Sequence, residues 1–120
     1  MKAKGMVVTD LDGTLFQKDH RISERNYQTL LDLGRRGIVR AIATGRHLYS
    51  AHKVLSADFP IDFLVFSSGA GILAWPERQL LFSASLNQEE LSLAFAALSR
   101  RSLDFMVHRP IPENHRFLYF

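Results

Sequence analysis

The chain has 120 residues, of which 47% are hydrophobic and 22% are charged, with seven Gly, four Pro and no Cys. This composition is typical of a folded globular protein and excludes disordered, collagen-like and disulfide-dependent classes. The formal net charge of +3 is too small to indicate a nucleic-acid partner. No apolar run reaches the ~20 residues of a membrane-spanning helix and no signal-peptide core follows Met1, so we expect a cytoplasmic protein without a membrane partner.

The first half of the sequence alternates short apolar runs with helical patterns. The predicted elements, in chain order, are a buried strand over 5–10, a helix over 23–36, a buried strand over 38–43, a helix over 47–56 and a strand over 63–66. Ser23 can cap the first helix and Gly37 ends it. Two further strands, 72–75 and 80–84, flank Pro76-Glu77-Arg78 like a hairpin.

This order of elements predicts an α/β fold, a doubly wound parallel sheet with helices on both faces. From residue 85 the pattern changes to a helix over about 87–101 and strands over 103–108 and 116–120. We therefore expect residues 1–83 to form the core and residues 84–120 to begin a second, α+β module.

Polar residues follow each of the three strands that are expected to be parallel. They are Asp10 after the first strand, Thr44 after the second, and Ser67-Ser68-Gly69 after the third. In open α/β sheets, ligands bind at the carboxyl ends of the strands. The sequence therefore predicts a ligand site at this edge of the sheet.

The chemistry of that site is indicated by Asp10, Asp12 and Gly13. Asp10 can attack phosphorus as a nucleophile, and Asp12 can protonate the leaving oxygen and then deprotonate water. Two carboxylates so close together repel each other, which favours a bound cation such as Mg²⁺. Gly13 lets the backbone turn and exposes its amides to phosphate oxygens.

The second strand end offers a phosphate cradle. Thr44 supplies a hydroxyl and Gly45 an unobstructed amide, at the mouth of the following helix. The fork of Arg46 can hold phosphate, bind a substrate hydroxyl, or pair with a local acid.

These motifs resemble a known family. Asp10-Leu11-Asp12-Gly13-Thr14-Leu15, Thr44-Gly45-Arg46 and Ser68-Gly69-Ala70, in this order and spacing, resemble the haloacid dehalogenase-like (HAD) superfamily, specifically its Cof-type sugar-phosphatase branch. The segment Pro112-Glu113-Asn114-His115-Arg116-Phe117 is similar to the early cap domain of that branch.

The resemblance implies a Mg²⁺-dependent phosphohydrolase that acts on small phosphorylated metabolites, with sugar phosphates favoured. Asp10 would form an aspartyl-phosphate and Asp12 would be the acid and base. Mg²⁺ would bind the Asp10 carboxylate and the Asp12 carbonyl. The phosphate-binding residues implied are Leu11, Gly13, Thr44, Gly45 and Arg46.

The sequence also departs from the family. The lysine and the Gly-Asp-rich acidic motif that family members carry after the cap are absent, so we expect this chain to correspond to the N-terminal part of such proteins. Ser68 stands where the branch has asparagine before Gly-Ala. Two alternatives remain open: a phosphomutase of the same superfamily, and a non-catalytic module that binds phosphate or a companion chain. An exposed sheet edge would favour self-association.

Overall fold

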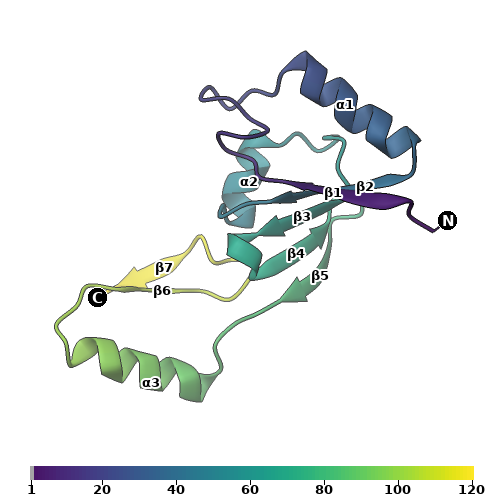
Figure 1. Cartoon of the computed structure of the whole chain (residues 1–120). Helices are drawn as coiled ribbons and strands as arrows, with labels where there is room; N and C mark the ends of the chain where they lie inside the picture. Colours follow the sequence, from purple (N-terminus) through teal and green to yellow (C-terminus); the bar gives the residue numbers. More distant parts are fainter. Residues whose placement is uncertain (1) are drawn as a thin grey trace.

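The computed structural model describes residues 2–120 (Figure 1). This part of the chain contains three α-helices and seven strands, and the strands form two sheets. Their bounds are β1 Gly5–Thr9, α1 Glu24–Arg35, β2 Ile38–Ala43, α2 Leu48–Val54, β3 Phe63–Phe66, the 3-10 helix η1 Ser67–Gly69, β4 Gly71–Ala74, β5 Gln79–Ser83, α3 Gln88–Ser99, β6 Met106–His108 and β7 Phe117–Tyr119. No helix of this part of the chain is long and apolar enough to cross a membrane.

The larger sheet has five strands in the order β1-β2-β3-β4-β5. The first three strands are parallel, and β4 and β5 are added in antiparallel orientation by tight connections. The smaller sheet pairs β6 with β7. The α/β class expected from the alternating pattern is confirmed, and the hairpin expected around residues 76–78 is the β4–β5 pair.

The helices begin where the sequence supplies caps. The Ser23 side chain accepts a hydrogen bond from the Asn26 amide and starts α1, and Gly37 follows its last turn with φ 76°. The first turn of α2 is capped by His47, whose Nδ1 accepts from the Ser50 amide at 3.0 Å. Asn87 and Glu90 form a capping box at the start of α3.

A single hydrophobic core lies between the two helices α1 and α2 and one face of the larger sheet. Leu30 of α1 and Leu55 of α2 belong to the same buried cluster as Ile42 and Leu64 of the strands. Because both helices pack on these residues, they cover the same face (Figure 1). Helices were expected on both faces, and within residues 2–120 α1 and α2 cover only one.

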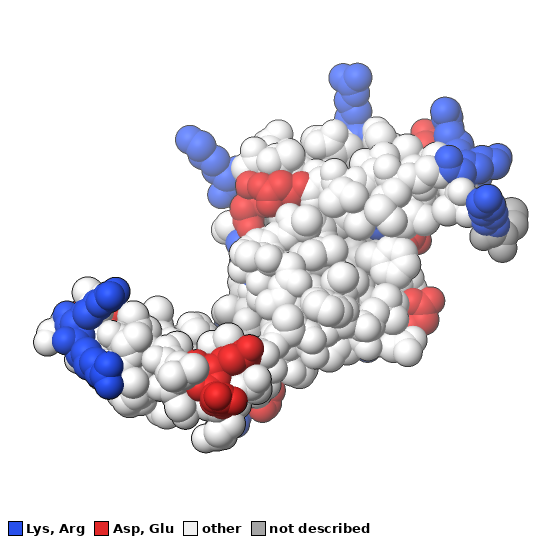
Figure 2. Space-filling view, turned by 60° about the horizontal axis from the view of Figure 1, so that its bottom comes forward, with Lys and Arg blue, Asp and Glu red and all other residues white. Residues whose placement is uncertain are grey.

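The opposite face of the sheet is largely apolar and bare. Strand register places Met6, Val8, Val39, Ala41, Ala43, Phe63, Val65, Ile72 and Phe82 on it. Figure 2 views the molecule from this side, and no Lys, Arg, Asp or Glu lies in the middle of the larger body.

The expectation that the first strand is buried is wrong. Met6 is 60% exposed and Val8 is 56% exposed, because β1 is an edge strand that pairs only with β2 among the described residues. A continuous apolar run like Met6-Val7-Val8 is typical of a strand that is covered on both faces of a sheet. Here that run lies at an open edge.

An ion pair joins Arg40, within β2, to Asp62, the residue just before β3. The Asp62 carboxylate accepts hydrogen bonds from Nε and Nη2 of Arg40, at 3.0 and 2.9 Å, and from its backbone amide at 2.7 Å. These bonds, largely through the Arg40 side chain, lower the pKa of Asp62, while partial burial opposes them. Nη1 of the same guanidinium donates to the Leu30 carbonyl, which anchors α1 over the sheet.

Candidate active site

Three loops meet at the carboxyl edge of the parallel strands. The first follows β1 and carries Asp10 and Asp12, and the second follows β2. Nε of Arg46 donates to an Asp12 oxygen at 2.7 Å and so ties these two loops together. The third loop follows β3, and its Ser68 amide donates to the Thr44 carbonyl at 3.1 Å. The convergence predicted from the strand ends is therefore confirmed.

The first loop is built around Asp10, which is exposed. One of its carboxylate oxygens accepts from the Leu11 amide at 2.8 Å, and the other lies 3.5 Å from the Thr14 hydroxyl. The Leu11 side chain is fully buried and anchors the loop on the core. Gly13 has φ 75°, a left-handed conformation that favours glycine, and no atom lies within 4 Å of where a Cβ would be.

Arg46 reaches from the second loop and holds the Asp12 carboxylate with two nitrogens, at 2.7 and 2.9 Å. Its third nitrogen donates to the Ser50 hydroxyl at 2.7 Å, and His20 Nδ1 lies 3.5 Å from Asp12. The hydrogen bond from Arg46 is the main cause that lowers the pKa of Asp12, and partial desolvation opposes it. Asp12 is therefore ionised at neutral pH in this arrangement.

The second and third loops form a small hollow of about 330 Å³ between Thr44-Gly45 and Ser68-Gly69. Thr44 is buried, and its hydroxyl oxygen accepts from the Arg46 amide at 3.1 Å. The third loop adopts the left-handed region at Ser67, Ser68 and Gly69 in succession, with φ of 50°, 54° and 97°. Such conformations concentrate at functional sites. Here the Ser67 and Ser68 amides donate to the carbonyls of Arg46 and Thr44, at 2.8 and 3.1 Å, which fixes the third loop against the second.

The donors available to a magnesium ion are oxygens of the first loop. The Asp10 carboxylate and the Asp12 main-chain carbonyl suit a hard cation, which takes its remaining ligands from water and phosphate. The Asp12 carboxylate is engaged by Arg46. Within residues 2–120 no cluster of three or more His, Asp or Glu side chains could hold a metal. These residues therefore fit part of a magnesium site.

The seven residues singled out from the sequence lie in the first two loops. They are Asp10, Leu11, Asp12, Gly13, Thr44, Gly45 and Arg46. Of the three roles open to Arg46, the contact observed is the pairing with a local acid. The sequence interpretation missed Ser50, which lies in the first turn of α2 and accepts from Arg46.

The segment after β6 also reaches the site. The Asn114 side-chain amide donates to the Ser67 hydroxyl at 2.8 Å, and the His115 ring stacks on Tyr49 with centroids 4.6 Å apart. The other amide atom of Asn114, Oδ1, is buried without a hydrogen-bond partner. No local pattern in the sequence indicates these contacts, because 47 residues separate Asn114 from Ser67.

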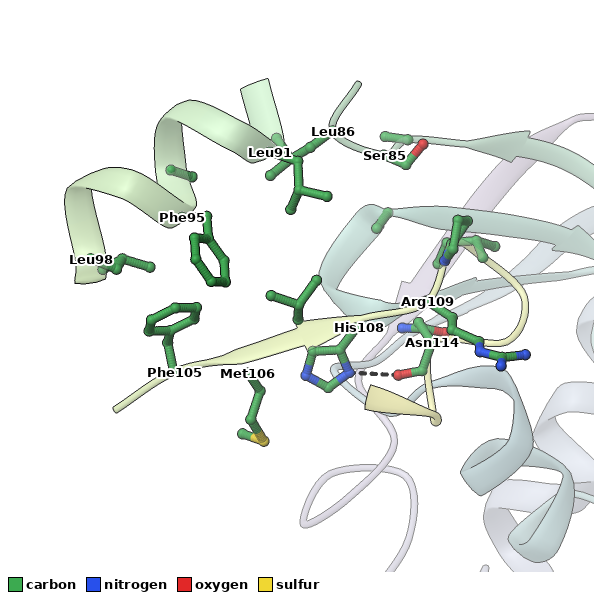
Figure 3. Close-up of a pocket in the computed structure, with 16 residues that line it drawn as sticks. Ser85, Leu86, Leu91, Phe95, Leu98, Phe105, Met106, His108, Arg109 and Asn114 are labelled. Atoms are coloured by element: carbon green, nitrogen blue, oxygen red, sulfur yellow. Dashed lines mark hydrogen bonds between the residues drawn. The ribbon is translucent and has the colours of Figure 1, made fainter. Parts of the chain in front are cut away.

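A larger, mainly apolar pocket of about 390 Å³ lies between α3 and β6 (Figure 3). At one end Phe95 meets Phe105 edge-on, with ring centroids 5.4 Å apart. At the other end His108 Nδ1 lies 2.7 Å from the Asn114 carbonyl oxygen. Because Asn114 also contacts Ser67, this end of the pocket borders the third loop of the site.

Comparison with known families gives one extensive match. The model of the haloacid dehalogenase-like hydrolase family matches residues 7–117, which is nearly the whole chain. The match includes all three loops and also α3, β6 and the first residue of β7.

Curated relatives match part of the chain. An HMP-PP phosphatase of Cronobacter sakazakii is 38% identical over 80 residues, which cover 67% of this chain and 29% of the relative. An HMP-PP phosphatase of Klebsiella pneumoniae is 41% identical over 64 residues, covering 52% of this chain and 23% of that protein. The matched regions are thus less than a third of either relative's length.

Solved structures share the fold. A HAD-superfamily phosphatase of Bacteroides thetaiotaomicron superposes with a TM-score of 0.77 over 98% of this chain and 41% of its own, at 19% identity. A HAD subclass IIB sugar phosphatase superposes with a TM-score of 0.66 over 98% of this chain and 44% of its own, at 21% identity. More than half of each of those chains lies outside the match.

Proposed function

Because the chain belongs to the haloacid dehalogenase-like hydrolase family, we propose that its three loops form the nucleophile-bearing part of a phosphatase site. The observation that carries the proposal is the bond between Arg46 and Asp12. It joins the loop that bears both carboxylates to the loop that bears Thr44, so a phosphate at the sheet edge would meet both.

The proposed reaction has two steps. In the first, an oxygen of the Asp10 carboxylate attacks phosphorus, the bond from phosphorus to the ester oxygen breaks, and Asp12 gives that oxygen a proton. In the second, Asp12 takes a proton from water, the water oxygen attacks phosphorus, and inorganic phosphate leaves as Asp10 is restored. The carboxylate held ionised by Arg46 suits the second step, and the first step requires Asp12 to gain a proton beforehand.

The phosphate itself would be held by main-chain amides and hydroxyls. The turn at Gly13 would let the backbone of the first loop approach a phosphate, and Thr44 and Gly45 line the hollow beside the third loop. Mg²⁺, held by the Asp10 carboxylate and the Asp12 carbonyl, would supply positive charge that neutralises the phosphate oxygens. Leu11 contributes through its backbone, because its side chain is buried.

We propose a small phosphorylated metabolite as the substrate. The relatives are named for HMP-PP, and one structural neighbour is described as a sugar phosphatase, so these two kinds of compound are the first to test. We further propose that residues 1–83 belong to the catalytic core and that residues 84–120 begin the cap, whose apolar pocket lies beside the third loop.

The test is release of inorganic phosphate from HMP-PP and from a panel of hexose phosphates, measured with added Mg²⁺ and again with EDTA. The proposal expects release that EDTA abolishes. Release that is unaffected by EDTA would contradict the magnesium role. Transfer of phosphate to a second sugar without release would indicate a phosphomutase.

A second candidate, a non-catalytic phosphate-binding module, is favoured by the small number of acidic ligands in the described residues. It predicts that inorganic phosphate binds to the chain while no ester is hydrolysed. Equilibrium dialysis with radiolabelled phosphate, run beside the release assay, separates this candidate from the phosphatase and from a chain that does neither.

A further inference from the structure

A chain of hydrogen bonds links Asp12 to the first turn of α2. Nη1 of Arg46 donates to the Ser50 hydroxyl at 2.7 Å, while the other two nitrogens of its guanidinium hold the Asp12 carboxylate. The Ser50 amide in turn donates to Nδ1 of His47 at 3.0 Å. Asp12 is therefore connected, through these two residues, to the His47 ring.

His47 is an unusual helix cap, because its capping atom belongs to a group that titrates near neutral pH. The side chains preferred at this position are those of Ser, Thr, Asn and Asp. A neutral imidazole accepts a hydrogen bond at Nδ1 when its proton is on Nε2, whereas a protonated imidazole has two donors and no acceptor. The bond from the Ser50 amide therefore requires a neutral His47 ring.

The surroundings of His47 make its protonation unfavourable. The ring is half-buried, and it faces His115 of the segment between β6 and β7, with ring centroids 5.8 Å apart. Burial is the main cause that lowers the pKa of His47. Positive charge on His115, on His108 of β6 and on Lys53 of α2 lowers it further, and a backbone hydrogen bond opposes these effects.

Other charged groups of this region are engaged with partners. The guanidinium of Arg46, the residue before His47, is paired with Asp12. Glu113, in the same segment as His115, lies 3.7 Å from Arg109. The groups that act on the His47 ring are thus mainly cationic, and a proton on the ring would add a positive charge beside the free amides of the first turn of α2.

We propose that His47 is a positioning residue for Asp12 and that it holds the second loop in place only while its ring is neutral. When the ring gains a proton, the Ser50 amide loses its acceptor and the first turn of α2 loosens. The Ser50 hydroxyl then no longer steadies the guanidinium of Arg46, and the contact of that guanidinium with Asp12 weakens.

The direction of the pH effect follows from the lowered pKa of His47. A histidine ring released from this environment has a pKa of about 6.5, so below that pH the released ring binds a proton more readily than the capping ring. The capped arrangement is therefore fully favoured above about pH 6.5 and is lost as pH falls through the pKa of the capping ring. Asp12 stays ionised over this range, because Arg46 lowers the pKa of its carboxyl.

NMR of the chain between pH 8 and pH 5 tests the proposal without substrate or metal. The signals to follow are those of the His47 ring, the Ser50 amide and the Nε–H of Arg46, the last of which donates to Asp12. We expect the three signals to change together, with one midpoint below pH 6.5. A His47 ring that titrates while the other two signals stay constant would overturn the proposal.

Two variants at position 47 separate the neutral cap from a merely structural role. His47→Asn keeps an acceptor that does not titrate, so the Ser50 and Arg46 signals should be independent of pH from 8 to 5. His47→Ala has no acceptor, so the Arg46 Nε–H should exchange with solvent at least about threefold faster than in the original chain, already at pH 8. An acid response that persists in His47→Asn, or an unchanged exchange rate in His47→Ala, would overturn the proposal.

Two other histidines supply the controls. His20 Nδ1 lies 3.5 Å from Asp12, so its protonation could disturb the same carboxylate. His20→Asn suits the left-handed backbone at this position, φ 57°, and should leave the response of the Ser50 amide in place. His115→Asn removes a charge that opposes protonation of His47, so the midpoint should move to higher pH. A response lost in His20→Asn, or a midpoint that does not rise in His115→Asn, would overturn the proposal.

These measurements do not depend on whether the chain hydrolyses phosphate esters. The role of Asp12 as acid and base rests on the proposed function, whereas its connection to His47 does not. A chain that releases no phosphate but shows the joint pH response would contradict the proposed function and support the positioning role of His47. Signals of Ser50 and Arg46 that stay constant from pH 8 to pH 5 would overturn the positioning role, whatever the release assay shows.

Discussion

The guanidinium of Arg46 donates hydrogen bonds to both carboxylate oxygens of Asp12, with nitrogen–oxygen distances of 2.7 and 2.9 Å. This contact joins two loops that are 34 residues apart in the sequence. It also keeps Asp12 ionised, because the hydrogen bond from Arg46 lowers the pKa of the carboxyl. The same arginine bonds Ser50, so the orientation of Asp12 depends on the first turn of α2.

Arg46→Ala should loosen the first loop. The pair is partly exposed, so we expect a modest loss of about 1 kcal/mol in the free energy of unfolding. Backbone hydrogen exchange at Asp12 and Gly13 should rise at the same time. The control is Arg21→Ala, which removes an arginine that is 85% exposed and 3.7 Å from Asp19. Equal behaviour of the two variants would show that the bond to Asp12 has no structural role.

Asp10→Asn should abolish phosphate release and leave the fold intact, because it removes the nucleophile from an exposed loop position. Asp12→Asn should slow release by roughly 10² to 10⁴-fold, the range for loss of a general acid and base. The control Asp19→Asn changes a neighbouring exposed carboxylate and should have no effect. Hydrolysis that persists in Asp10→Asn would contradict the proposed mechanism.

Asp62→Asn should destabilise the fold by about 1–2 kcal/mol, because it weakens a partly buried ion pair with Arg40. The pKa of Asp62 is lower in the folded than in the unfolded chain, where it is about 3.9. Its contribution is therefore present above that pH and is lost as pH falls through the folded-state pKa.

Urea unfolding of both forms between pH 2 and pH 7 checks this prediction. The difference in stability between the original chain and Asp62→Asn should shrink in acid. Asp32→Asn is the matched control, because its partner Arg35 and its own side chain are mostly exposed. A difference that stays constant down to pH 2 would show that the Asp62 charge does not stabilise the fold.

Gly71→Ala should destabilise the sheet by about 1–3 kcal/mol, because an added Cβ would lie only 2.2 Å from the Phe66 ring. Phe66→Leu removes part of that ring, so the double variant should lose less than the sum of the two single losses. Gly5→Ala is the control, since its Cβ would make only a 3.4 Å contact with Ile38. Additive losses, measured by urea unfolding, would mean that the clash relaxes elsewhere.

The order of the elements could be predicted because its signals are local. Strand bounds at 38–43 and 63–66 agree with the structure, since continuous apolar runs end at polar turns there. The start of α1 followed from the Ser23 cap. The exposure of β1 could not be predicted in this way, because a local apolar run does not reveal whether a neighbouring strand is present.

The candidate site divides in the same manner. The convergence of Asp10 and Thr44 follows from the rule that carboxyl ends of parallel strands share an edge. The partner of Arg46 could not be predicted from the sequence, because its guanidinium could equally bind a phosphate, a substrate hydroxyl or a local acid. Only the fold brings Asp12 beside it. The hydrogen bond between Asn114 and Ser67 joins residues 47 positions apart in the sequence. It could not be predicted, because it depends on how the segment after β6 folds back toward the third loop.

The central claim, that the loops after β1 and β2 hold phosphate with Mg²⁺, is tested most directly by amide NMR of the chain titrated with Mg²⁺ and then with inorganic phosphate. We predict that the amides of Leu11, Gly13 and Gly45 shift together, and that Asp10→Asn removes the response to Mg²⁺. Shifts confined to other parts of the chain, or an unchanged response in Asp10→Asn, would contradict the account.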